Sequence, residues 1–321
     1  MRITRRESLA LLGAATCTAA TVQDQWRQIA KEIDGTAGAA ALNFRTGESI
    51  TLRATARFPM ASVCKLPIAI AIFNLIDKGK LSRDQMIDIP LYDIFPGVSP
   101  IADRYPHQKQ FPLDEMVQLM VAKSDNTAVQ TLFRLAGGQP GLASCFQQWK
   151  VDGMRVDRDE RTCTLESVGV RNIPPVAEWT PGMGEALIAK VPAADQLAAF
   201  RRFIQDPRDS VTPLSAVQLL TKLHQGELLS KPSTARIIQI LESTTTAPGR
   251  IKGLLPPGNV VAHKTGTTTT TVGGLNGSTN DAGIVAGRFA IAVFIKSSTA
   301  SADVRDKIIA RISRAAFDHF G

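Results

Sequence analysis

Strand patterns lie at both ends of this chain, and helical patterns fill the long stretch between them. Alternating and β-branched residues predict strands at residues 39–44, 49–52, 260–264, 281–286 and 289–295. Helical spacing predicts helices at residues 26–33, 66–76, 113–120, 126–135, 213–223, 232–242 and 304–320. Strands so far apart in sequence form one antiparallel sheet only if the chain returns to its starting point. The order therefore predicts an α/β fold, in which a discontinuous antiparallel-sheet domain flanked by helices carries an inserted all-α domain.

Two domains are a usual number for a chain of 321 residues. We place the sheet domain at residues 21–65 and 248–321, and the all-α domain at residues 66–247. Hydrophobic residues make up 44% of the chain and charged residues 21%, which excludes a disordered or fibrous protein. No apolar run is long enough to cross a bilayer as a helix, so a multi-span membrane protein is excluded too.

Residues 1–20 resemble an export signal rather than part of the fold. Arg2, Arg5 and Arg6 form a basic start, and a short apolar stretch with small residues follows. The adjacent arginines are typical of a twin-arginine signal, and a general secretory signal is the alternative. Either signal predicts a periplasmic or secreted protein after cleavage.

Charge and composition argue against nucleic acids, metals and cofactors as partners. Cleavage of the signal lowers the formal charge of +8 by two, and the remaining basic residues form no tract. The histidines are scattered, without a metal-binding spacing, and no phosphate-binding glycine loop occurs. Three cysteines remain, an odd number that argues against a disulfide framework. We interpret them as small buried hydrophobes; they are Cys64, Cys145 and Cys163.

The first candidate catalytic motif is Ser62-Val63-Cys64-Lys65, at the start of the apolar helix 66–76. A serine hydroxyl is a weak nucleophile until a neighbouring base takes its proton. Residues i and i+3 share a helix face, so Lys65 could reach the Ser62 oxygen. Burial would lower the pKa of the lysine and make its amine a better proton acceptor. Alone, the motif is a weak signal, because a chain of this composition contains about one Ser-x-x-Lys by chance.

Two further motifs follow in order along the chain. Ser124-Asp125-Asn126 lies between two predicted helices, where a plain helix cap is the alternative interpretation. Lys264-Thr265-Gly266-Thr267 lies at the end of a predicted strand, where an exposed strand end is the alternative. The three motifs together are the set found in class A β-lactamases and penicillin-binding proteins. With Phe58-Pro59-Met60-Ala61 before Ser62, nearly the whole mature chain resembles the class A serine β-lactamases.

This resemblance implies a reaction and a role for each motif residue. The reaction is hydrolysis of the β-lactam amide bond of penicillin- and cephalosporin-type antibiotics, which gives resistance. Ser62 would attack the lactam carbonyl, and Lys65 would accept and relay its proton. Ser124 would pass a proton to the departing ring nitrogen. Asn126 would hydrogen-bond the acylamino side chain of the substrate.

The third motif is implied to bind the substrate as well. In the segment from Lys264 to Gly266, Lys264 and Thr265 would hold the substrate carboxylate. The backbone N–H groups of Ser62 and Thr267 would form the oxyanion hole. The resemblance implies no cofactor, and we expect a monomer.

Deacylation in the resembled family depends on a glutamate that positions a water. Glu160 is the candidate, because it lies 36 positions after Ser124, in step with the family. The alternative is a surface carboxylate in a charged loop. Thr164 stands where the family has an asparagine, so the water would be held by a hydroxyl with fewer donors and acceptors.

A larger departure follows Glu160, since an extra segment lies at about residues 165–205, longer than ordinary loops. We expect a small inserted subdomain with a helix near residues 196–203, and Arg158 and Asp209 pairing across its base. Arg250 matches a position from which other members reach the substrate carboxylate; an ordinary surface arginine is the alternative.

Other function classes remain open at this point. A DD-peptidase or penicillin-binding protein shares the Ser–Lys chemistry but lacks a deacylating glutamate. A β-lactam or peptidoglycan sensor would form the acyl adduct and stop. A periplasmic solute-binding protein would need no reactive serine. The position of Glu160 favours the hydrolase over the first two.

Overall fold

The computed structural model describes residues 21–95, 97–180, 182–269, 271 and 273–321. The predicted export signal at residues 1–20 lies outside the described residues. The helices are α1 Val22–Ala30, α2 Lys65–Asp77, α3 Pro100–Arg104, α4 Leu113–Ala122, α5 Asn126–Leu135, α6 Gly138–Trp149, α7 Glu160–Ser167, α8 Met183–Ile188, α9 Ala193–Gln205, α10 Pro213–His224, α11 Lys231–Glu242 and α12 Ala302–Phe320. The strands are β1 Thr36–Asn43, β2 Ser49–Leu52, β3 Phe58–Pro59, β4 Met86–Asp88, β5 Gln110–Pro112, β6 Ser210–Val211, β7 Val261–Thr267, β8 Asn276–Val285 and β9 Phe289–Ser298.

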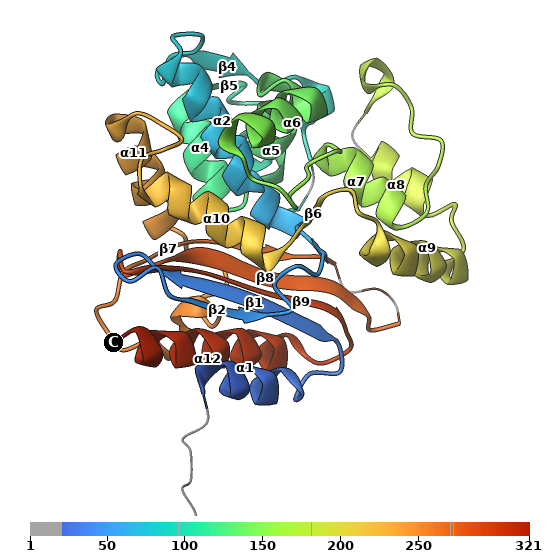
Figure 1. The fold of residues 1–321 in the computed structure, drawn as a ribbon. Helices are drawn as coiled ribbons and strands as arrows, with labels where there is room; N and C mark the ends of the chain where they lie inside the picture. The colour runs from blue at the N-terminus through green and yellow to red at the C-terminus, as the bar shows by residue number, and fades with distance from the viewer. Residues whose placement is uncertain (1–20, 96, 181, 270, 272) are drawn as a thin grey trace, which may run out of the picture.

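The five long strands form one antiparallel sheet in the order β2-β1-β9-β8-β7. The first and last strands of the chain pair directly, with Ala39 opposite Val293. The expected return of the chain to its starting sheet is therefore confirmed, and so is the α/β fold with a discontinuous antiparallel sheet (Figure 1).

Each face of the sheet is covered by helices, because successive side chains of a strand point to opposite sides. In β9, Ile291 and Val293 join the core under α1 and α12, where the indole N–H of Trp26 donates to the Ile312 carbonyl at 2.9 Å. The intervening residue Ala292 joins the opposite core, under the helices of the middle of the chain. Helix α10 packs on this second face, although we had placed it in the all-α domain. The exact domain boundaries stay a prediction.

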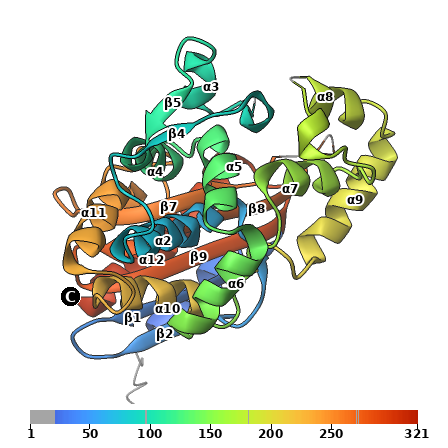
Figure 2. The ribbon, with the colours of Figure 1, turned by 90° about the horizontal axis from the view of Figure 1, so that it is seen from above.

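Helix α2 lies at the centre of the helical region, surrounded by α4, α5, α6 and α11 (Figure 2). Residues 65–73 are all buried, as expected for a helix that is apolar almost all round. Because neighbours hold it on every side, the turn at its N-terminal end is fixed as well. No helix among the described residues is long and apolar enough to cross a membrane.

The extra segment forms α8 and α9 beside the main body (Figure 1). Helix α9 packs against α7 on one side and against β3 and β8 on the other. Glu160, for which a surface carboxylate in a charged loop was the alternative interpretation, begins helix α7, whose N-cap is Asp159. Helix α6 was not predicted: Gly137, with φ +90°, follows the end of α5 and is the N-cap of the next helix, which starts at Gly138.

Candidate active site

Ser62 lies in a single 3₁₀ turn, Ala61–Cys64, that leads directly into α2. The amide of Asn280 holds this turn from β8 by donating to the Pro59 carbonyl at 2.8 Å. Gly266 on β7 approaches so closely that an added Cβ would lie 2.7 Å from the Met60 carbonyl oxygen. Only glycine allows this approach, which brings the end of β7 beside the nucleophile turn. Ser62 itself is partly exposed and lines a cavity.

Lys65 is fully buried at the start of α2. Its Nζ donates to Asn126 Oδ1 at 2.6 Å, to the Ser124 carbonyl at 2.7 Å and to Ser124 Oγ at 3.2 Å. Within the described residues, no hydrogen bond joins the Lys65 Nζ to the Ser62 side chain, the contact expected from the i,i+3 spacing. Burial lowers the pKa of Lys65, and the negative charge of Glu160 partly offsets this. The ammonium is therefore easier to deprotonate than a lysine in water.

Ser124 has the left-handed φ of +62°, between α4 and α5. The helix cap proposed as the alternative role of this motif belongs to Asp125 alone, which accepts from the Ala128 N–H at 2.8 Å. Ser99 Oγ and the Ile101 N–H donate to the same carboxylate. Because Asp125 anchors the turn, Ser124 and Asn126 on either side are free to face Lys65.

Lys264 lies on β7 and is also fully buried. Its Nζ donates to Ser124 Oγ at 3.2 Å and to the Thr265 carbonyl at 2.9 Å. Burial, reinforced by the charge of Lys65, lowers the pKa of Lys264 to about 7. Ser124 Oγ thus accepts from two lysines on different elements, which links the three groups by hydrogen bonds. Thr265 Oγ1 is 2.6 Å from Thr246 Oγ1.

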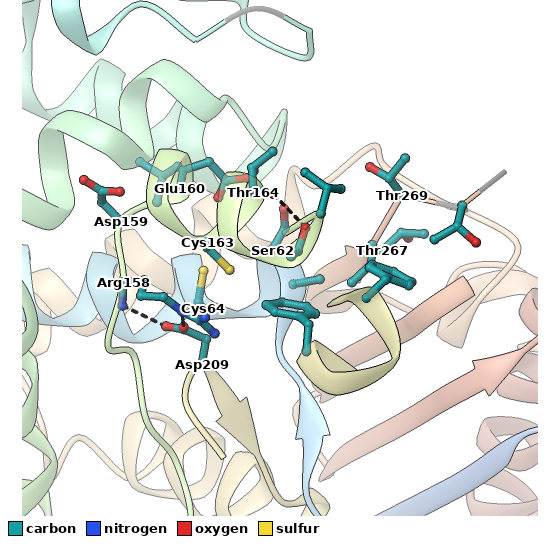
Figure 3. Close-up of a pocket in the computed structure, with 18 of the residues that line it drawn as sticks. Ser62, Cys64, Arg158, Asp159, Glu160, Cys163, Thr164, Asp209, Thr267 and Thr269 are labelled. Atoms are coloured by element: carbon teal, nitrogen blue, oxygen red, sulfur yellow. Dashed lines mark hydrogen bonds and ion pairs between the residues drawn. The ribbon is translucent and has the colours of Figure 1, made fainter. Parts of the chain in front are cut away.

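Glu160 and Thr164 lie one turn apart on α7 and face the same cavity as Ser62 and Thr267 (Figure 3). The cavity measures about 390 Å³, within the usual range for small-molecule sites. The first turn of α7 is held by Asp159, which accepts from the Thr162 N–H at 2.7 Å and from the Gln130 amide at 2.9 Å. The Glu160 carboxylate on α7 and the Ser62 hydroxyl in the turn before α2 therefore face one cavity from two separately anchored elements.

Comparison with known proteins agrees with this geometry. The model of the beta-lactamase enzyme family matches residues 21–320. This chain belongs to that family. It is 30% identical to the extended-spectrum beta-lactamase PER-1 of Pseudomonas aeruginosa over 276 residues, 84% of this chain and 78% of the relative. It is 27% identical to beta-lactamase VEB-1 of the same organism, over 88% of this chain and 85% of that one.

Solved structures show the same relationship. A beta-lactamase from Chitinophaga pinensis shares 32% identity, with a TM-score of 0.78 over 94% of this chain and 99% of that one. The TLA-1 extended-spectrum beta-lactamase shares 28% identity, with a TM-score of 0.76 over 93% and 97%. The resemblance to class A serine β-lactamases is confirmed, and the chain is an enzyme of this hydrolase family.

Arg250 is buried behind β7 in this β-lactamase, so it is no ordinary surface arginine. Its Nε donates to Asp306 at 2.8 Å, and one Nη donates to the carbonyls of Gly266 and Asn280. The other Nη donates to Thr267 Oγ1 at 2.7 Å. The guanidinium therefore reaches the cavity through the Thr267 hydroxyl, and direct contact with a substrate carboxylate stays a prediction.

Arg158 and Asp209 of the β-lactamase pair across the base of the inserted segment, as expected, and they form the buried part of an ion cluster. Arg158 Nε donates to Asp209 Oδ2 at 2.5 Å, and its Nη1 donates to Glu166 at 2.7 Å. Asp206 lies 3.6 Å from the same Nη1. Arg208 joins from the surface, 2.7 Å from Asp206 and 3.1 Å from Glu166. The segment thus leaves after Glu166 and returns at Asp206 within one cluster.

The three described cysteines of the β-lactamase are free, as the odd count suggested. Each is only partly buried, and Cys64 and Cys163 line the cavity between Ser62 and the Arg158–Asp209 pair (Figure 3). Burial raises the pKa of Cys64 to about 12 and that of Cys163 well above its usual value.

The sequence did not point to several residues that line or support the cavity. Leu197 and Phe200 line it from α9, and Thr246 touches Thr265. These positions lack a motif, and only tertiary folding brings them to the site. The start of α7 did carry a signal, since Asp159 precedes Glu160 as an acidic N-cap does.

Proposed function

We propose that this β-lactamase hydrolyses penicillins and cephalosporins through an ester formed on Ser62. One observation carries the proposal: the Ser62 hydroxyl and the Glu160 carboxylate line the same cavity. Beside this cavity, the buried Lys65 and Lys264 both donate hydrogen bonds to Ser124 Oγ. This arrangement offers a nucleophile, a proton path and a second base, which are the groups that a two-step hydrolysis needs.

In acylation, Ser62 Oγ attacks the lactam carbonyl carbon and the ring C–N bond breaks. The hydroxyl proton passes to the Lys65 amine and on through Ser124 Oγ to the leaving nitrogen. The lowered pKa of Lys65 supports this path, as do its hydrogen bonds to Ser124. The backbone N–H groups of Ser62 and Thr267 would stabilise the carbonyl oxyanion, because Gly266 brings that strand end beside the nucleophile turn.

In deacylation, Glu160 accepts a proton from a water whose oxygen attacks the ester carbon. The Ser62–acyl bond breaks, and the serine oxygen takes back the proton that Glu160 accepted from the water, which restores both side chains. Thr164 lies one helical turn after Glu160, where its hydroxyl can hold that water. Lys264, Thr265 and Asn126 would bind the substrate carboxylate and acylamino group.

We further propose that the enzyme acts as a monomer in the periplasm or outside the cell, after cleavage of residues 1–20. No cofactor, metal or nucleic acid takes part in this reaction scheme. The basic start of residues 1–20 supports export, and the scattered basic residues give no tract for nucleic acid.

The test follows hydrolysis of a chromogenic cephalosporin together with the intact mass of the protein. We expect turnover by the wild type and none by Ser62→Ala. Glu160→Ala should accumulate a covalent adduct, because the ester forms but no base activates the water. Glu185→Ala, which removes an exposed carboxylate of the inserted segment, is the matched control and should turn over normally.

Two results would overturn the proposal. Stoichiometric labelling of the wild type without turnover would identify a peptidase or a sensor instead. No labelling and no turnover would show that Ser62 is not a nucleophile toward these compounds.

A further inference from the structure

The active-site cavity continues past Ser62 and Glu160 into the inserted segment. Its far part is lined by apolar side chains, which we call the annex: Val168, Ile188, Leu197 and Phe200. The first follows α7, the second ends α8, and the last two belong to α9. Thr267 and Thr269, at and beyond the end of β7, line the same cavity (Figure 3). The annex is thus continuous with the space where a bound lactam would lie.

The walls of the annex are held by close packing. Phe200 is 3% exposed, and its ring lies so close to Gly277 on β8 that an added Cβ there would be 2.8 Å from Cζ. Leu197 is only partly buried, and its Cδ2 would lie 3.4 Å from a Cβ built on Gly273. Phe203, next on the same side of α9, stacks with Phe200 at 6.1 Å between ring centroids. Helix α9 is therefore a fixed wall, with Leu197 the more accessible of its two annex side chains.

The charges of the cavity do not favour an anionic ligand group in the annex. Four charged residues line the cavity as a whole, and two of them, Arg158 and Asp209, neutralise each other at 2.5 Å. Asp159 is occupied as the N-cap of α7, and Glu160 faces Ser62's side of the cavity. What the annex offers a ligand is mainly apolar surface, which attracts apolar groups and not charged ones.

We propose that the annex binds a bulky apolar substituent, such as an aryl group, on the acylamino side chain of the β-lactam. Leu197 is then a specificity-determining residue supplied by the inserted segment. This inference rests on the proposed function, since it takes the lactam carbonyl to lie between Ser62 and Thr267. A substituent that leaves the lactam along the cavity between α7 and Thr269 arrives at Leu197 and Phe200.

The test compares two substrates that share one nucleus: 6-aminopenicillanic acid, which has no acyl group, and a penicillin with a naphthyl acyl group. In the wild type, kcat/KM should be higher for the naphthyl compound. Leu197→Trp fills the annex and should lower kcat/KM for that compound by at least about tenfold, the effect of one methylene or more in an apolar pocket. The same variant should leave kcat/KM for 6-aminopenicillanic acid within about twofold.

Two further variants complete the design. Leu197→Asn keeps the number and branching of the side-chain heavy atoms but replaces the two methyl groups by a polar amide, and it should raise KM for the naphthyl compound alone. It covers the case in which Leu197→Trp does not fold, which circular dichroism would reveal. Ala198→Trp places the same indole on the exposed side of α9 and should leave kcat/KM unchanged for both substrates.

The outcomes separate this inference from the proposed function. If the wild type neither hydrolyses nor is acylated by either compound, the proposed function fails and the annex with it. If both compounds are hydrolysed but the Leu197 variants change kcat/KM equally for both, or for neither, Leu197 sets no specificity. Only the annex proposal is then overturned.

Discussion

The Arg158–Asp209 pair allows a stability prediction whose size follows from burial. The Arg158 side chain is 5% exposed and that of Asp209 is 9% exposed. Arg158→Met keeps apolar volume but leaves the carboxylate without a cation. Losing one member of a buried pair costs about 3–5 kcal/mol. Asp209 keeps the N–H groups of Asp157 and Arg158, at 2.7 and 3.0 Å, so we expect about 3 kcal/mol.

Arg208→Met is the matched control in the same cluster. The Arg208 side chain is 43% exposed, and exposed ion pairs contribute about 0–1 kcal/mol. A second comparison removes the unpaired carboxylate. Asp209→Asn in the Arg158→Met background should recover part of the lost stability. Asparagine is neutral, can still accept the backbone N–H groups, and tolerates the φ of +48° at this position.

The dependence on pH gives an independent check of the same reasoning. Burial raises the pKa of Asp209, and Arg158 partly opposes that rise. Without Arg158 the pKa rises further, so the folded state binds more protons than the unfolded state as the pH falls. Stability of Arg158→Met relative to wild type should therefore improve from pH 7 toward about pH 5.

The assay is urea unfolding of the mature chain, followed by fluorescence of the buried Trp26 and Trp149. The reasoning is refuted if Arg158→Met loses no more stability than Arg208→Met. It is refuted as well if Asp209→Asn deepens the loss in the Arg158→Met background.

Three other properties can be measured directly. Gly266→Ala should lower kcat/KM by about a hundredfold and stability by about 1–3 kcal/mol, because the added Cβ would lie 2.7 Å from the Met60 carbonyl oxygen. Urea denaturation and cephalosporin turnover measure the two effects, and unchanged turnover would contradict the prediction. Burial lowers the pKa of Lys264 to about 7, so kcat/KM should fall as the pH rises through that value, because the ammonium that we propose to bind the substrate carboxylate is lost. A flat profile between pH 6 and 8 would contradict this. Cys64 and Cys163 should react with a thiol reagent far more slowly in the native enzyme than in urea, because their raised pKa values keep the thiols protonated. Equal rates would argue against these raised pKa values.

The sequence predicted the long elements well because each carries its own periodic signal. Helix α5 was expected at residues 126–135 and has those bounds. Short elements were missed because they depend on distant partners. Strand β3, residues 58–59, exists only by pairing with β6, residues 210–211, about 150 positions away. A two-residue strand has no pattern to detect.

The candidate site shows the same limit at the level of side chains. The motifs predicted which residues belong to the site, but not which hydrogen bonds their side chains make. The i,i+3 spacing suggested a side-chain contact between Lys65 and Ser62, whereas the Lys65 Nζ donates to Ser124, in the turn before α5, and to Asn126, the first residue of α5. Arg250 lies behind β7 and not on the surface, because Asp306 of α12 holds it there. Such contacts depend on how separate elements meet, which sequence spacing does not encode.

The two ends of the inserted segment meet at one cluster, and this affects how the enzyme can change. Glu166 and Asp206 contact the same guanidinium, so the chain between them spans almost no distance. The entropy of closing a loop grows only slowly with its length. A change in the length of the chain between these anchors therefore costs little loop-closure entropy, as long as the packing of α9 against α7, β3 and β8 is kept. The segment is therefore a place where the lining of the cavity can vary in sequence and length, while Ser62, Lys65 and Lys264 stay on elements outside it.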